Sequence, residues 1–410
     1  MRLKAKRYFL IISIAITLFI NPTDTLGCTI FCLSDSTQSL MGNSEDYIEE
    51  GYMTLVKQNS PDYGMITFSF ADKWVQGGVN EYGLAIDGTG AIKEMYMVSD
   101  SSLEDLPSKE NIVEIILKRC KNTDQAIELC RKYNLPVLKY GHLMFADSSG
   151  NSAIVVLDKE GHTQFIRKEC NYQLLTNFNP LNPEVGYYPC ERFDTANSML
   201  PDLAINEWKA SEVLNAVRQE GCIKTHYGNV YDCRNKKFFF FRNLDYTQSL
   251  LFNIDELLKG NVFRVKVKSL PKLEQFTYPV ESTVVETGNN SVSFRAVKGD
   301  YKLIMSKSEN FENPIVIPII SGKIDEASLG LFFFIVLFLF IPWKKFKAAS
   351  LALLLFVSIS CDKDPDLFQP VEKYNVQITV NETGKWFWKI EGKTNSGYNI
   401  TTKTLSFRIE

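Results

Sequence analysis

Apolar residues recur at every second position, or in short runs, over much of the N-terminal part of the chain, which is the spacing of β-strands. Residues 29–33 are expected to form a strand, 35–38 a turn and 39–43 a returning strand. Further strands are expected at 52–58, 65–71 and 84–88, within 141–176, and at 225–232 and 237–242. The first hairpin therefore begins directly after residue 28.

Four other stretches carry apolar residues three and four positions apart, as amphipathic helices do. They are residues 105–119, 122–133, 184–199 and 205–219. Asn122 is the expected N-cap of the second of these helices. Because the strands come in two groups, each followed by helices, the pattern predicts an α+β fold in which two sheets pack between two helical layers.

Past residue 260 the pattern changes. Short β-like runs occur at 283–286, 291–297, 301–305 and 315–320. They predict a small accessory β module over residues 261–322. Two charge-free apolar runs follow, at 329–342 and 348–360, and each is shorter than the roughly 20 residues that span a bilayer. The last stretch, 361–410, alternates again and predicts a small β-rich tail.

The hydrophobic region 327–360 has more than one interpretation. Residues 327–343 would make a marginal spanning helix, with the lysines between 344 and 347 at its cytoplasmic end. Residues 344–361 also resemble a lipoprotein signal that ends in Cys361, as at the start of a second exported protein. A hairpin of two short helices is a further alternative for this C-terminal part.

The first 27 residues have the layout of an export signal, with a basic region, an apolar region and a polar end. Cleavage after Gly27 would leave Cys28 with a free α-amine beside its thiol. Their reference pKa values, about 7.7–8.0 and about 8.5, suit a base and its nucleophile. A disulfide partner and a lipid-modified cysteine are the plainer alternatives. The strand that follows at once favours a fixed nucleophile over a lipid tether.

Composition narrows the classes of function. A chain of 410 residues allows two or three domains, and 45% hydrophobic with 23% charged residues is typical of a globular protein. The net charge of -3 gives no reason to expect a nucleic-acid partner. His142, His162 and His226 have no metal-ligand spacing, so we expect no metal or other cofactor and no Cys-His protease. The nine cysteines are scattered, and their odd number leaves at least one thiol free.

A series of short motifs occurs between residues 28 and 255. They are Cys28-Thr29, Gly42-Asn43-Ser44-Glu45-Asp46, Gly78-Val79-Asn80-Glu81-Tyr82-Gly83-Leu84, the pair His142–Asp147 and Ser152–Val156, Leu175-Thr176-Asn177, and Glu191-Arg192-Phe193. In this order they resemble the motifs of the choloylglycine hydrolase and penicillin V acylase family, cysteine N-terminal-nucleophile (Ntn) hydrolases of linear amides. Asn43 departs from that family, which has an arginine there, and Thr89-Gly90 stand in place of a further asparagine.

The resemblance implies a four-layer αββα Ntn-hydrolase sandwich over residues 28–260. It assigns catalytic roles to Cys28, Asp46, Asn177 and Arg192, and substrate contacts to Asn43 and Asn80. An asparagine amide can donate to a tetrahedral oxyanion, an arginine near a thiol favours the thiolate, and an aspartate can orient the α-amine. Without the resemblance, the same residue types are most often turn, cap or surface groups.

The sequence thus predicts an exported enzyme that cleaves the amide bond of a small N-acyl amide through an acyl-enzyme on Cys28. Two alternatives stay open: an N-acyltransferase, in which an amine replaces water, and a non-catalytic lipid-anchored binding module. The catalytic domain would be periplasmic or extracellular and tethered to the membrane through residues 327–360. Nothing in the sequence predicts the acyl and amine specificity or the oligomeric state.

Overall fold

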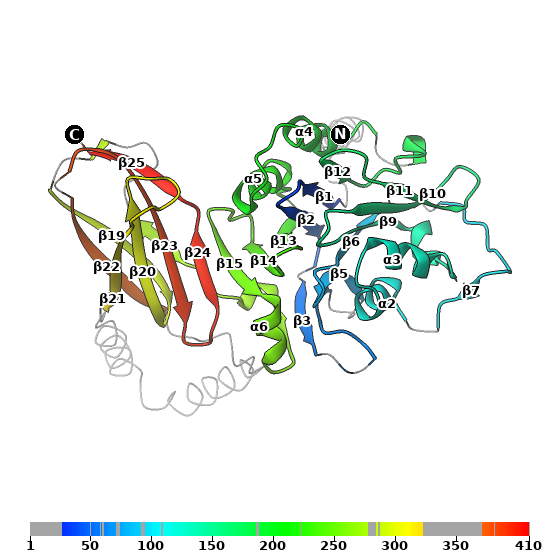
Figure 1. The fold of residues 1–410 in the computed structure, drawn as a ribbon, viewed down its shortest axis with the longest axis horizontal. Helices are drawn as coiled ribbons and strands as arrows, with labels where there is room; N and C mark the ends of the chain where they lie inside the picture. Colours follow the sequence, from blue (N-terminus) through cyan, green and yellow to red (C-terminus); the bar gives the residue numbers. More distant parts are fainter. Residues whose placement is uncertain are drawn as a thin grey trace, which may run out of the picture. The chain divides into compact units, whose positions relative to one another are not determined.

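The computed structural model divides into two compact units (Figure 1). It describes residues 27–49, 51–57, 59, 61–70, 74–91, 95–107, 110–185, 188–221, 223–277, 284–285, 288–322, 371–380 and 382–409. The first unit extends to Tyr246 and takes in Phe252–Lys268. The second comprises Thr247–Leu251 and Ser269–Glu410. The residues predicted to form a site all fall in the first unit.

One sheet of the first unit carries the start of the described chain. Its strands lie in the order β12 (Tyr172–Leu175), β1 (Thr29–Ser34), β2 (Ser39–Tyr47), β13 (Lys224–Asp232) and β14 (Lys237–Arg242). Neighbouring strands are antiparallel. The predicted hairpin at the start of the chain is therefore present, and it occupies the middle of a sheet rather than an edge.

The second sheet of this unit has eight strands, in the order β11-β10-β9-β6-β5-β4-β3-β16. Their bounds are β3 (Tyr52–Val56), β4 (Met65–Ser69), β5 (Val75–Asn80), β6 (Ala85–Gly90), β9 (Gly141–Ala146), β10 (Ser152–Leu157), β11 (Thr163–Arg167) and β16 (Phe263–Lys266). The predicted strands at 52–58, 65–71 and 84–88 correspond to β3, β4 and β6. A short parallel ladder joins β7 (Glu104–Asp105) to β8 (Tyr133–Asn134).

Helices cover the outer face of each sheet. Their bounds are α2 (Ile112–Arg119), α3 (Thr123–Cys130), α4 (Glu191–Met199), α5 (Glu207–Val217) and α6 (Ile254–Lys259), with short 3-10 turns at Pro136–Lys139, Pro183–Val185 and Val267–Ser269. α2 packs on β4, β5 and β6, whereas α5 packs on β2 and β13, and α4 on β12. The two sheets meet where β1 contacts β6 and β2 contacts β9. The predicted four-layer αββα fold is therefore confirmed.

The helices begin later than their apolar spacing predicts, for local reasons. The Asn111 side chain accepts a hydrogen bond from the Val113 N–H at 2.9 Å and caps α2, so this helix starts at residue 112 rather than 105. The residues before it lie in the β7–β8 ladder. α4 starts at Glu191 rather than 184 because Pro189 restricts the backbone of the residue before it to extended conformations.

Apolar side chains buried between α2, α3 and the second sheet make a core cluster of this unit. Leu84, Ile86, Ile116 and Phe145 in this cluster are fully buried. Each such side chain contributes about 1.5–3 kcal/mol relative to an exposed one. This helical layer therefore stabilises the second sheet from outside, while on the other face Phe68 of β4 packs against Tyr227 and Phe240 of the first sheet.

The second unit is a β structure built from two distant parts of the chain. It comprises β15 (Gln248–Asn253, to Leu251), β17 (Glu274–Thr277), β18 (Val284–Val285), β19 (Gly288–Val297), β20 (Gly299–Ser306), β21 (Ile315–Gly322), β22 (Val371–Val380), β23 (Gly384–Thr394), β24 (Asn399–Thr402) and β25 (Leu405–Ile409). β22 pairs with β19 and β21, and β23 pairs with β20. The segments predicted as a separate module and tail therefore interleave.

Residues 1–26 and 323–370 lie outside the described residues. They contain nearly all of the predicted export signal and all of the predicted hydrophobic region 327–360. Within the part of the chain that is described, no helix is long and apolar enough to cross a membrane.

Candidate active site

The hairpin of β1 and β2 fixes the position of Cys28. Thr29 opens β1 opposite Ser44 of β2, and the Thr29 N–H donates to Ser44 Oγ at 3.3 Å. At the other end of the hairpin, Asp35 Oδ1 accepts hydrogen bonds from the backbone N–H groups of Thr37 and Gln38, at 2.6 and 2.7 Å, and closes the turn. Cys28 is thus held at the head of a central strand and is buried, with 7% of its surface exposed.

Neighbouring residues of β2 face opposite ways, because side chains alternate along a strand. Asp46 lies on the helix side, where Arg192 of α4 and Thr225 reach it. Glu45 points the other way, where the charge of Asp87 on β6 acts on it. The two carboxyls therefore belong to different environments although they are adjacent in sequence.

The thiol of Cys28 faces the Glu45 side. Its Sγ–H donates to Glu45 Oε1 at 3.6 Å. Burial raises the pKa of the Cys28 thiol well above its ordinary value, and the negative charges of Glu45, Asp46 and Asp87 raise it further. In this arrangement the thiol is neutral, so a nucleophilic role requires a group that takes its proton.

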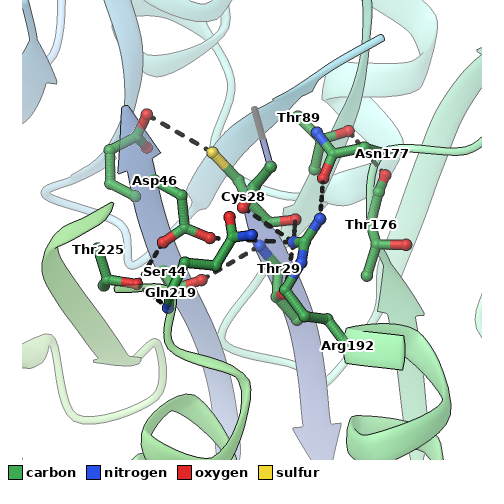
Figure 2. A network of polar contacts seen from close by, with 12 residues as sticks. Cys28, Thr29, Ser44, Asp46, Thr89, Thr176, Asn177, Arg192, Gln219 and Thr225 are labelled. Carbon is green, nitrogen blue, oxygen red and sulfur yellow. Dashed lines mark hydrogen bonds and ion pairs between the residues drawn. The ribbon is translucent and has the colours of Figure 1, made fainter. Parts of the chain in front are cut away.

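Arg192 contacts the main chain on both sides of the Gly27–Cys28 peptide bond. Its Nη1 donates to the carbonyl oxygens of Gly27 at 2.8 Å and of Cys28 at 2.9 Å, and to Thr29 Oγ1 at 3.2 Å (Figure 2). Its side chain is 12% exposed. The expectation that Arg192 favours the thiolate does not describe this geometry, because the guanidinium binds carbonyl oxygens and the pKa of the thiol is raised.

Asn177 holds Arg192 in place. Its Oδ1 accepts from Arg192 Nη2 at 2.8 Å, while its NH2 donates to the carbonyl of Gly90 at 2.6 Å. A side chain at Gly27 would not fit here, since its Cβ would come within 2.7 Å of Asn177 Oδ1. The amide predicted to donate to an oxyanion thus already donates to a backbone carbonyl in this state, and its oxygen orients the guanidinium.

Asp46 is connected to the Gly27–Cys28 peptide bond through Gln219. Its Oδ1 accepts a hydrogen bond from Thr225 Oγ1, and its Oδ2 lies 3.9 Å from Arg192 Nη1. The side-chain NH2 of Gln219, in the orientation that its neighbours require, donates to Asp46 Oδ2 at 3.0 Å and to the Gly27 carbonyl at 3.2 Å. Burial raises the pKa of Asp46 to about 7, and the contacts with Thr225 and Arg192 limit that rise.

Asn80 does not join this cluster, contrary to the predicted substrate contact. Its NH2 donates to the carbonyls of Leu117 and Cys120 at 2.9 and 2.7 Å, and its Oδ1 accepts from the N–H groups of Tyr82 and Leu84. The amide is fully buried and fully used. It ties the turn after β5 to the end of α2, which is a structural task.

Asn43 lies on the Glu45 side of β2, opposite Ile30 of β1 and Asn229 of β13. It is fully buried, and neither its Nδ2 nor its Oδ1 has a hydrogen-bond partner among the described residues. Glu45 Oε2 and Asn229 Oδ1 are also buried without a hydrogen-bond partner among the described residues. Asn43 is thus part of a polar layer between the sheets.

Sequence reasoning missed four residues of this cluster: Glu45, Asp87, Gln219 and Thr225. Alternation along β2 would have placed Glu45 on the face opposite Asp46. The other three come from β6, from the segment after α5 and from β13, and no local signal connects these elements with Cys28. A cavity of about 270 Å³ is lined by Arg192 and Gln219, among other residues at α4 and at the end of α5.

A disulfide partner was one of the plainer roles considered for Cys28. All seven described cysteines carry free thiols, Cys28 among them. No group of three or more His, Cys, Asp or Glu residues in the described ranges could hold a metal ion. His142 is buried on β9, and burial lowers its pKa to about 4, so it is neutral.

No protein-family model and no curated protein matches the chain. Among solved structures, penicillin V acylase from Agrobacterium tumefaciens is similar with a TM-score of 0.42 and 18% identity, over 59% of this chain and 87% of that one. A mutant of the conjugated bile acid hydrolase from Clostridium perfringens is similar with a TM-score of 0.44 and 15% identity, over 58% and 96%. A second variant of that hydrolase has a TM-score of 0.45 and 15% identity, over 58% and 97%.

Proposed function

We propose that the chain hydrolyses a linear amide bond, with the Cys28 thiol as nucleophile and an acyl-enzyme as intermediate. One observation carries this proposal: an amide carbonyl, that of Gly27, is already bound beside Cys28 by Arg192 at 2.8 Å and by Gln219 at 3.2 Å. Once Gly27 is removed, both donors lose this acceptor. A substrate carbonyl that took its place would restore the hydrogen bonds.

The same two donors suit the charge that develops during amide cleavage. Attack by sulfur turns the carbonyl oxygen into an oxyanion, which fixed donors stabilise more strongly than they stabilise the neutral carbonyl. Arg192 supplies a full positive charge, and it is held by Asn177 on one side and lies near Asp46 on the other. In this proposal Asn177 acts mainly by positioning Arg192.

The α-amine of Cys28 completes the proposed site. It exists only after the Gly27–Cys28 bond has been cut, and its reference pKa of about 7.7–8.0 allows it to exchange protons near neutral pH. Gln219 links Asp46 to the carbonyl of the same peptide bond, and in this proposal Asp46 orients the α-amine.

The proposal is tested with purified chain that starts at Cys28, incubated with a panel of N-acyl amides. We expect turnover of at least one member and, in quenched samples, an added acyl mass on the peptide that contains Cys28. Cys28→Ala should show neither. Acyl transfer to an added amine would assign the transferase reaction instead, and a lipid-modified or wholly inactive Cys28 would reject the enzymatic proposal.

We further propose that the chain is exported and held at a membrane through residues 327–360. Gly322 and Lys373 are register partners in the antiparallel pair β21–β22, so the chain re-enters the fold beside the point where it leaves. Both ends of the intervening segment must therefore lie on one side of the membrane.

This topology can be checked by thiol labelling in intact cells, with a membrane-impermeant reagent and in a Cys170→Ser background, because Cys170 is exposed. Lys307→Cys lies before the segment and Ser396→Cys after it, and both positions are exposed. We expect both to be labelled from outside. Labelling of one alone would contradict the shared side, and labelling of neither would contradict export.

A further inference from the structure

The place that Gly27 holds beside the nucleophile limits the shape of the acyl group that the proposed site can take. Gly27 is buried, and its carbonyl oxygen accepts hydrogen bonds from Arg192 Nη1 at 2.8 Å and from the Gln219 NH2 at 3.2 Å. In the proposed reaction a substrate carbonyl takes over these two donors. The carbon next to that carbonyl then lies either on the side of the Gly27 Cα or on the side of the Cys28 nitrogen.

The chemistry of amide cleavage decides between the two sides. In the proposed reaction the α-amine of Cys28 takes the thiol proton as sulfur bonds to the carbonyl carbon, and it gives that proton to the leaving nitrogen as the C–N bond breaks. The leaving nitrogen therefore lies next to the α-amine. This amine is the former nitrogen of the Gly27–Cys28 peptide bond. The carbon of the acyl group consequently lies on the opposite side, where the Cα of Gly27 stands.

Two side chains close the space around the Cα of Gly27. A Cβ in the L configuration there would overlap Arg192 Nη2, and it would lie 2.6 Å from Arg192 Cζ and 2.7 Å from Asn177 Oδ1. Protein Cβ atoms do not come within 3.0 Å of other heavy atoms in this way. A branch on the α-carbon of a bound acyl group would meet the same atoms.

The guanidinium of Arg192 cannot move aside without losing hydrogen bonds. Its Nη1 donates to the Cys28 carbonyl at 2.9 Å and to Thr29 Oγ1 at 3.2 Å, and its Nη2 donates to Asn177 Oδ1 at 2.8 Å. Asn177 is fixed in turn, because its NH2 donates to the carbonyl of Gly90 at 2.6 Å. The wall beside the Gly27 Cα is thus held by α4, β1, β6 and the segment after β12.

We propose that the site accepts acyl groups whose α-carbon is an unbranched CH2, and that Arg192, held by Asn177, is the residue that determines this specificity. The inference rests on the proposed amide hydrolysis and deepens it, since it names the class of acyl group. An α-carbon that carries no hydrogen must fill the position of the Gly27 Cβ in every orientation, so acyl groups with two α-substituents are rejected. The contacts at Gly27 place no such limit on branches further along the acyl chain.

The test compares three amides of one amine, the amine that is released fastest in the panel of N-acyl amides. Their acyl groups are hexanoyl, 2,2-dimethylhexanoyl and 3,3-dimethylhexanoyl, and the last two are isomers that differ only in the branched carbon. Each kcat/KM is divided by the rate of alkaline hydrolysis of the same amide, which removes the intrinsic effect of branching. We expect the 2,2-dimethyl isomer to be cleaved at least about 10²-fold less efficiently than the 3,3-dimethyl isomer, the usual cost of displacing a reacting group by about 1 Å.

The specificity should depend on how firmly Arg192 is held. Asn177→Ala frees the guanidinium, so the ratio between the two isomers should fall several-fold even though kcat/KM falls as well. Asn197→Ala is the matched control, because Asn197 of α4 also accepts a hydrogen bond, from the Tyr172 hydroxyl at 3.0 Å, and it should leave the ratio unchanged. A merely structural role for Asn177 would lower kcat/KM for all three amides alike and keep the ratio.

A second measurement needs no substrate. It uses the full chain with residues 1–27 retained and with Cys28→Ala, so that the thiol cannot cut the Gly27–Cys28 bond. Adding Gly27→Ala places a methyl group against Arg192 and should lower Tm by at least about 2–4 °C, because overpacking at a buried position destabilises the fold. Gly90→Ala in the same background is the control: a Cβ there has no heavy atom within 4 Å, and Tm should stay the same.

The proposal is overturned if the 2,2-dimethylhexanoyl amide is cleaved as efficiently as its isomer, or if Gly27→Ala leaves Tm unchanged. If the chain cleaves no amide at all, the proposed hydrolysis fails. A fall in Tm would in that case still show that the position next to the bound carbonyl has no room for a branch.

Discussion

The two faces of β2 hold neighbouring carboxyls in contrasting surroundings. On the helix side Asp46 has Thr225, Gln219 and the positive charge of Arg192 around it. On the side of the second sheet Glu45 has the thiol and a second buried acid, Asp87, with no cation among the groups that act on it. Both pKa values are raised by burial, but only that of Asp46 is limited by an arginine.

The difference shows how one strand can give two adjacent carboxyls different electrostatic surroundings. The helix face presents donors and a positive charge to a carbonyl, which is what an oxyanion needs. The sheet face places the thiol beside Glu45, a buried carboxyl whose pKa is raised by burial and by the charge of Asp87. Cys28 sits at the end of the adjacent strand, where its carbonyl faces one set of groups and its sulfur the other.

The contribution of the helix face to catalysis can be tested by substituting Arg192. Arg192→Ala should lower kcat/KM by about 10²–10³, the usual loss for one oxyanion donor. Asn177→Ala should cost less, because its NH2 already donates to Gly90 and its oxygen only orients the guanidinium. Steady-state kinetics on chains with unchanged circular dichroism decide the order. A larger loss for Asn177→Ala would return the oxyanion role to the asparagine.

The environment of Asp87 on the sheet face can be tested by measuring how the stability of the folded protein depends on pH. The folded pKa of Asp87 is about 7, against about 3.9 in an unfolded chain, so between these values the folded state binds more protons. Stability from this group therefore falls as pH rises from about 4 to about 7 and is level above. Asp87→Asn removes the charge and should raise Tm at pH 8 by at least about 2–4 °C, the shift that 1 kcal/mol produces.

The matched change on the other face is Asp46→Asn. It should raise Tm at pH 8 less than Asp87→Asn does, or lower it, because it leaves Arg192 without its nearby carboxylate. At pH 4 both variants should come close to the parent. Thermal unfolding from pH 4 to pH 8 measures this, and an equal gain on both faces would contradict the difference drawn between them.

The smallest effect is expected at Asn43. Its amide is fully buried without a partner among the described residues, and an unpaired buried polar group costs about 1–3 kcal/mol. Asn43→Leu, of similar size, should keep or modestly raise Tm. A clear fall in Tm would show that the amide is satisfied by a buried water between the sheets.

Several features of the fold were predictable because they depend on neighbours in sequence. Alternation of apolar residues predicted the first hairpin, and helical spacing predicted four helices in their order. The starts of α2 and α4 were each missed by seven residues, 112 instead of 105 and 191 instead of 184, since a cap at Asn111 and a proline at 189 decide them rather than the apolar pattern. The pairing of β22 and β23 with β19 to β21 was not foreseen, because strands far apart in sequence leave no local mark of their partners.

The sequence by itself determined that Cys28 heads a strand and that Asn43 lies on its partner, whereas the structure extends that partner strand to Tyr47 and so includes Glu45 and Asp46. The tertiary structure decided what each residue meets. It brought Asp87 and Arg192 to opposite faces of the hairpin. It also engaged the side-chain amide of Asn80 in four hydrogen bonds with backbone groups. The reason is physical: a residue type limits which bonds and charges are available, but burial and partners set proton affinity and access, and both arise only when the layers pack.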